Sequence, residues 1–91
     1  MAEVVITLKI MPDGVDSDLN KIKEEATKKI SEFGGEVGKS EEVPVAFGLK
    51  SLVLIFVMDE KIGSTEKLED DISEISGVQS VDVTDVRRAI G

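Results

Sequence analysis

The sequence predicts a single α+β domain spanning residues 1–91, in which four strands and two helices follow in the order β-α-β-β-α-β. Two stretches, residues 3 to 11 and 51 to 58, are apolar on both alternating faces, which is typical of strands in the middle of a sheet. Two other stretches carry apolar residues three and four positions apart, as in a helix packed along one side. Because each helical stretch lies between two extended ones, the chain divides into two β-α-β halves.

The first half begins with the strand "EVVITLKIM" and continues into a helix that starts at Leu19. The linking segment "PDGVDSD" breaks the strand and offers Asp16 or Ser17 as the helix N-cap. The helix is expected to end at Gly34 and Gly35, because glycine readily adopts the left-handed C-cap conformation. Its apolar stripe consists of Leu19, Ile22, Ala26, Ile30 and Phe33.

Residues 36 to 47 alternate weakly and predict an edge strand, because Pro44 cannot donate a hydrogen bond to a neighbour. The next strand, residues 51 to 58, follows after the short link "FGLK", which predicts an antiparallel hairpin. On the edge strand, one side is expected to carry Val37, Val43, Val45 and Phe47.

The second helix is expected to start near residues 63 to 65 and to end at Gly77, with Leu68, Ile72 and Ile75 as its apolar stripe. The stretch "VQSVDVTDV" then alternates valines with polar residues, which indicates a half-buried edge strand. Residues 87 to 91 are expected to form a short tail beyond it.

The two halves share a weak internal repeat, since residues 11 to 17 and 58 to 64 have the same spacing, with Val15 and Ile62 at matching offsets. Right-handed crossovers in two nested β-α-β units give the ferredoxin-like plait, a four-stranded antiparallel sheet with both helices on one face. The helices then cover only one row of the third strand. The other row is either a partner surface or is screened by neighbouring lysine and threonine side chains.

Composition restricts the function. The chain has no Cys, His, Trp or Tyr, which excludes disulfides, thiolate or imidazole metal sites and histidine acid–base chemistry. A formal charge of −8 argues against direct nucleic-acid binding and against anionic membranes. The N-terminus lacks a targeting signal, and the longest apolar run is far shorter than the roughly 20 residues that span a bilayer. We therefore expect a cytoplasmic protein.

No pattern of an enzyme is present. Acidic pairs such as Asp59–Glu60 resemble solvated faces of helices and loops, and the glycines form no phosphate-binding fingerprint. Three phenylalanines are too few for RNA-stacking on the sheet. We expect no cofactor and no metal, and a protein that acts by binding and not by covalent catalysis.

Two features remain as candidate binding residues. Phe47 lies beside a turn, with Gly48 and Lys50 after it, and is either a core residue at a strand end or an anchor for a partner. Arg87 and Arg88 are the only two arginines of an acidic chain. They either solubilise the terminus or recognise a partner's phosphate or carboxylate, for which the guanidinium group is suited.

The motifs "VPVAFGLKSL" (43–52), "MDEKIGSTEKLEDDI" (58–72) and "GVQSVDVTDVRR" (77–88) closely resemble the guanine-nucleotide exchange domain of translation elongation factor 1-beta, in its short archaeal version. The resemblance is dense from Pro44 to Arg88 and looser before. It implies a ferredoxin-like fold and the release of GDP from elongation factor 1-alpha during protein synthesis. It also implies that Phe47, with Gly48 and Lys50, contacts the G protein's second domain.

In this family the chain end is inserted near the G protein's Mg²⁺ and phosphate site, where a penultimate Lys disturbs the metal. The resemblance places that Lys at Arg88, with Arg87 able to share the role. The sequence departs from the pattern in having Arg at this position and three further residues, 89 to 91, after it.

Two alternatives belong to other classes. ACT-type regulatory modules share the β-α-β-β-α-β order and bind small molecules near a Gly-rich first β-α loop, whereas the loop here has one Gly and several acids. A structural subunit that uses the uncovered sheet face is the third possibility.

Overall fold

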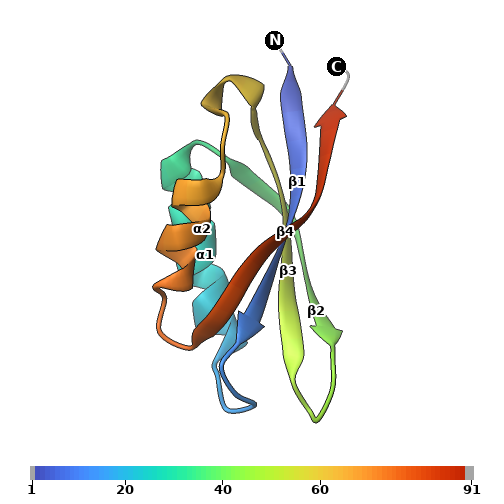
Figure 1. Cartoon of the computed structure of the whole chain (residues 1–91), viewed down its shortest axis with the longest axis vertical. Coiled ribbons are helices and arrows are strands. Elements are labelled where there is room, and N and C mark those ends of the chain that lie inside the picture. Colours follow the sequence, from blue (N-terminus) through green and yellow to red (C-terminus); the bar gives the residue numbers. More distant parts are fainter. Residues whose placement is uncertain (1, 90–91) are drawn as a thin grey trace.

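The computed structural model describes residues 2–89 and contains one four-stranded antiparallel sheet with both helices on one face (Figure 1). The strand order is β2-β3-β1-β4, so the two apolar strands lie at the centre, as predicted. This arrangement confirms the ferredoxin-like plait. The elements are β1 (Glu3–Pro12), α1 (Leu19–Phe33), β2 (Glu36–Pro44), β3 (Lys50–Asp59), the 3₁₀ turn η1 (Glu60–Ile62), α2 (Glu66–Ser73) and β4 (Val78–Ala89).

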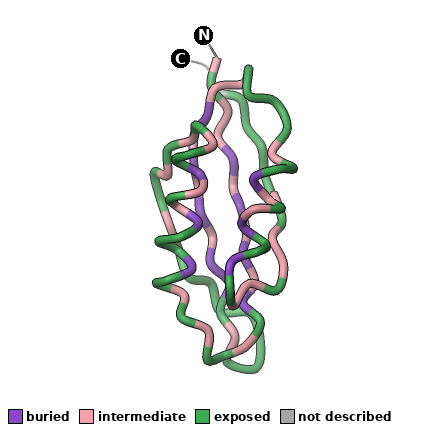
Figure 2. Tube along the Cα trace, turned by 90° about the vertical axis from the view of Figure 1, so that its left-hand side faces the viewer, coloured by how far each residue is buried: buried purple, intermediate pink, exposed green. Residues whose placement is uncertain are grey.

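The hydrophobic core lies between the sheet and the helices, because every second residue of β1 and β3 points toward α1 and α2. Figure 2 shows this alternation as buried positions spaced along the central strands. The row of β3 that includes Phe56 therefore packs on the helices, and Phe56 is 0% exposed. The core residues are Ile6, Leu8, Ile10, Ile22, Ala26, Ile30, Leu52, Leu54, Phe56, Met58, Leu68, Ile72 and Ile75.

The ends of α1 follow from specific hydrogen bonds. Asp18, and not the expected Asp16 or Ser17, caps the N-terminus, because its carboxylate accepts from the backbone N–H groups of the second and third residues after it. The Ser17 hydroxyl donates instead to Asp13, at 2.8 Å. At the other end Gly34 adopts the predicted left-handed conformation, with φ 109°.

The second helix is shorter than predicted. It starts after Thr65, as expected, but ends at Ser73, four residues before Gly77. Ile75 is still buried, so this core position is supplied by the turn between α2 and β4. Within residues 2–89 neither helix is long and apolar enough to cross a membrane.

An irregularity in β2 overturns the prediction that its valines share one side with Phe47. Val37 pairs with Phe56 and so faces the helices, whereas Val43 pairs with Ser51 on the opposite face. The register shift between Val37 and Lys39 inserts Gly38 as an extra residue, and a one-residue shift sends every later side chain to the other face.

The sheet face without helices is only partly screened. Its central row on β3, made of Val53, Ile55 and Val57, is half-buried and lies beside Thr7 and Lys9 of β1. Its rims carry short ion pairs within single strands, at 3.0 Å between Lys39 and Glu41 and at 2.8 Å between Arg87 and Asp85.

Candidate partner-binding site

The hairpin between β2 and β3 turns through two residues in the left-handed region. Leu49 donates its backbone N–H to the Ala46 carbonyl at 2.9 Å, and the residues between them, Phe47 and Gly48, have φ of 53° and 79°. Positive φ at both central positions is the signature of a type I′ turn, whose twist matches that of the flanking strands. Among residues 2–89, Phe47 is the only non-glycine residue with positive φ.

The Phe47 side chain projects from this turn into solvent. It is 97% exposed, whereas Phe56 is fully buried and Phe33 packs against the core. The choice left open by the sequence between a core residue and an exposed residue is therefore resolved: Phe47 makes no contribution to the core.

Other apolar side chains are exposed at the same end of the molecule. Val43 and Val45 belong to the same hairpin, and Val15 belongs to the loop between β1 and α1. A side-chain carbon built at Gly48 would lie 3.7 Å from Val15, so the loop lies close to the hairpin at this point. We call Val15, Val43, Val45 and Phe47 together the hairpin surface.

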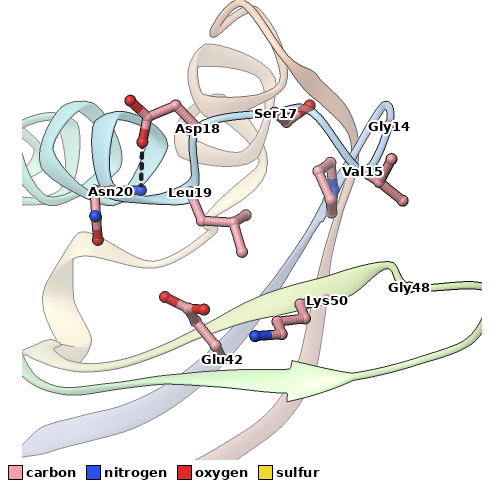
Figure 3. Close-up of a pocket in the computed structure, with 10 residues that line it drawn as sticks. Gly14, Val15, Ser17, Asp18, Leu19, Asn20, Glu42, Gly48 and Lys50 are labelled. Atoms are coloured by element: carbon pink, nitrogen blue, oxygen red, sulfur yellow. Dashed lines mark hydrogen bonds between the residues drawn. The ribbon is translucent and has the colours of Figure 1, made fainter.

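A groove of about 400 Å³ separates that loop from the hairpin on the helix side (Figure 3). Lys50, the first residue of β3, lines the groove with Glu42, and Figure 3 shows both side chains on the same side of the hairpin. Phe47, Gly48 and Lys50 are thus neighbours in the chain, but the lysine faces the groove while the phenylalanine projects from the tip. Among residues 2–89, no group of three or more acidic side chains is placed to hold a metal ion.

The two arginines lie at the opposite end of the sheet and are not in a tail. β4 continues to Ala89, and Arg87 and Arg88 pair with Val5 and Val4 of β1. This corrects the expected short tail from residue 87 onward. The expectation failed because β1 is long enough to bind the extra residues of β4 along its full length. Residues 90 and 91 of the expected tail lie outside the described residues.

Consecutive strand residues point to opposite faces of a sheet, so the two arginines diverge. Arg87 lies on the face without helices, where its Nε donates to Asp85 at 2.8 Å. Arg88 lies on the helix side, where its Nε and Nη2 donate to one oxygen of Glu60, at 3.0 and 2.7 Å. The structure therefore does not bring the two arginines to one point.

Sequence patterns do not identify two of the residues at these ends as candidate binding residues. Val15 belongs to the internal repeat, and its exposed position near Gly48 is visible only in the fold. Glu60 lies in the motif of residues 58 to 72 and belongs to an acidic pair typical of a solvated surface, and its pairing across 28 residues with Arg88 gives no signal in the sequence.

Comparison with known proteins places the chain in a family. Residues 5–89 match the family described as EF-1 guanine nucleotide exchange domain. An elongation factor 1-beta of Methanothermobacter thermautotrophicus is 44% identical over 88 residues, covering 97% of this chain and 98% of the relative. Those of Methanococcoides burtonii and Staphylothermus marinus are 42% and 40% identical, each over at least 97% of this chain.

Solved structures of low identity share the fold alone. The ACT domain of a GTP pyrophosphokinase from Chlorobium tepidum has a TM-score of 0.60 at 16% identity and covers 89% of this chain and 97% of that domain. The C-terminal domain of the MgtC protein from Mycobacterium tuberculosis has a TM-score of 0.58 at 15% identity, covering 98% of this chain and 87% of that domain. The plait is thus common to several functions, while the sequence match is specific. This chain belongs to the EF-1 guanine nucleotide exchange domain family, among whose archaeal members are the elongation factors 1-beta.

Proposed function

We propose that this protein is a guanine-nucleotide exchange factor that releases GDP from elongation factor 1-alpha in the elongation step of protein synthesis. The family match over residues 5–89 and the archaeal elongation factor 1-beta relatives support the exchange role. The protein acts by binding its partner in the cytoplasm, without covalent chemistry and without contacting nucleic acid.

The single structural observation that carries the proposal is Phe47. An exposed aromatic side chain gives up the favourable burial of its apolar surface, and a bulky residue in the left-handed region adds backbone strain. Strained positions of this kind concentrate at functional sites. An aromatic group that is unfavourable in the free protein on both counts is well suited to be buried in a partner's pocket, where aromatic anchors dominate binding.

Exchange follows from thermodynamic linkage. A factor that binds the nucleotide-free G protein more tightly than the GDP-bound form must weaken GDP affinity by the same ratio. In this proposal the hairpin surface anchors the complex, with Lys50 beside it, and the arginine end meets the nucleotide site. Because Arg87 and Arg88 face opposite sides of the sheet, one site can take only one of them, and the family resemblance assigns it to Arg88.

The test is the release of fluorescent GDP from the cognate elongation factor 1-alpha, followed after mixing with excess unlabelled nucleotide. We expect this protein to accelerate release in a saturable manner. An unchanged release rate at saturating protein contradicts the proposal. A control titration with amino acids followed by thermal shift distinguishes an ACT-type module, which gains stability on binding its ligand.

A further inference from the structure

Glu60 joins the start of β1 to the end of β4 from a third element, the η1 turn that follows β3. Its backbone N–H donates to the carbonyl of Ala2 at 3.2 Å, which fixes the turn against the first strand. Its carboxylate oxygen Oε2 accepts from both Nε and Nη2 of Arg88, at 3.0 and 2.7 Å. The carboxylate therefore meets the arginine from a backbone that is itself held in place.

This contact uses one edge of the guanidinium, and the other edge has no partner in the part of the chain that the structure describes. A guanidinium carries five N–H donors in a planar fork, and Glu60 occupies the side edge formed by Nε and Nη2. The end edge carries one Nη1 donor and the second Nη2 donor, and neither has a hydrogen-bond partner among residues 2–89. The Arg88 side chain is 68% exposed, so this end edge is open to a partner.

We propose that Glu60 is a positioning residue, which orients Arg88 so that its free end edge binds an oxyanion at the partner's nucleotide site. A planar fork presented edge-on matches the two oxygens of a phosphate or a carboxylate. The inference rests on the proposed exchange function and adds to it a residue, Glu60, that orients the Arg88 guanidinium. Without Glu60 the long arginine side chain samples many rotamers, and few of them point the fork at the anion.

A second pair in the same strand provides a matched control. Arg87 donates only its Nε to Asp85, two residues away in the same strand and on the face without helices. Glu60→Gln and Asp85→Asn make the same chemical change to the two arginine partners. Only the first alters the arginine on the helix side.

The experiment measures GDP release at saturating exchange factor with the full-length chain and its partner. We expect Glu60→Gln to lower the release rate by about tenfold, because the Arg88 guanidinium is no longer held in the orientation that binds the oxyanion. Asp85→Asn is expected to keep the wild-type rate. In an Arg88→Ala background, Glu60→Gln is expected to have no further effect, because Glu60 acts only through Arg88. An unchanged rate for Glu60→Gln, or an equal loss in both variants, overturns the proposal.

A charge exchange separates positioning from simple stabilisation. Glu60→Arg with Arg88→Glu retains an ion pair and is expected to keep the melting temperature, but to leave release slow because the carboxylate now lies on β4. Recovery of the wild-type rate by this double variant overturns the proposal. Failure of wild-type protein to release GDP is a different result, and contradicts the exchange function itself.

The source of the oxyanion is identified by binding measurements. If Arg88 binds a carboxylate of the partner that becomes accessible as GDP leaves, Glu60→Gln weakens binding to the nucleotide-free partner more than to the GDP-loaded partner, which supports the proposal. If Arg88 binds a phosphate of the bound GDP, Glu60→Gln weakens binding to the GDP-loaded partner alone. That second result overturns the proposal, because such a contact would hold GDP in place.

Discussion

At the level of single residues, Phe47 shows where sequence patterns stop being informative. Asn-Gly and Asp-Gly are the usual type I′ pairs, because asparagine and aspartate tolerate positive φ. The pair Phe47-Gly48 is not typical of such a turn. The alternation of apolar and polar residues is equally compatible with a buried and with an exposed phenylalanine. Its exposure became evident only when the two φ angles and the packing of the hairpin were known.

Replacing Phe47 by Asn is expected to change stability and binding in opposite directions. Asparagine relieves the strain of a bulky residue at φ 53°, so the free energy of unfolding should rise by up to about 1 kcal/mol. Loss of the aromatic anchor should weaken binding to elongation factor 1-alpha by about 2 kcal/mol. Urea denaturation and a binding titration measure the two effects.

Phe47→Ala is the companion variant, since it removes the ring without supplying a residue suited to the turn. It should weaken binding as much as Phe47→Asn does. A fall in unfolding free energy comparable to the loss of binding would return Phe47 to a structural role.

At the level of elements, the hairpin and β4 differ in how far the sequence predicts them. The hairpin follows from a short Gly-containing link between two β-branched runs, and the structure places it as predicted. The sequence does not predict where β4 ends, because charged residues are common both on edge strands and in solvated tails. Pairing with a ten-residue β1 decides the matter, and the sequence does not state how far that pairing extends. The bulge at Gly38 is hidden for the same reason.

The hairpin turn depends on Gly48. With φ of 79°, this residue is strained by any side chain, so Gly48→Ala should lower the free energy of unfolding by about 1 kcal/mol. Gly14 offers the matched control, because its φ is not in that region and no atom lies within 4 Å of an added carbon. Denaturation curves for Gly14→Ala and Gly48→Ala that coincide would contradict the turn geometry.

The strand geometry of β4 predicts unequal roles for its two arginines. Removing a charged hydrogen-bonding group that contacts an ion costs about 1.5–3 kcal/mol, so Arg88→Ala should slow GDP release about 10- to 100-fold. Arg87→Ala changes the opposite face and should leave release near the wild-type rate. Release kinetics of the two single variants give the answer, and a loss confined to Arg87→Ala excludes the assignment of Arg88.

At the level of the whole molecule, the topology separates the two candidate ends. The hairpin and the loop after β1 lie at one end of a 42 Å long body, and the arginines, η1 and the described chain ends lie at the other (Figure 1). The predicted strand order already implies this separation. The β2–β3 hairpin lies where β1 ends, and the antiparallel β4 ends where β1 starts. The strand order does not tell which side chains are exposed at each end.

Because the two sites lie at opposite ends of a body 42 Å long, their contributions to the complex should be independent. Free-energy effects of distant, unconnected sites add within about 0.5 kcal/mol. We expect Phe47→Ala and Arg88→Ala to combine additively in the apparent second-order rate of exchange. A coupling energy well above that limit in a double-mutant cycle indicates that one end reorganises the other.

The pairing of β1 with β4 has a consequence for how the protein folds during its synthesis. The first strand of the sheet, β1, is flanked on one side by its last strand, β4, with partners such as Val4 and Arg88 more than eighty positions apart. Sheets closed by such distant partners fold late and comparatively slowly. A nascent chain on the ribosome can fold its hairpin early, but one edge of β1 stays open until residues 78–89 have been synthesised. Arg88 can therefore join the sheet only after the first three strands and both helices have been synthesised.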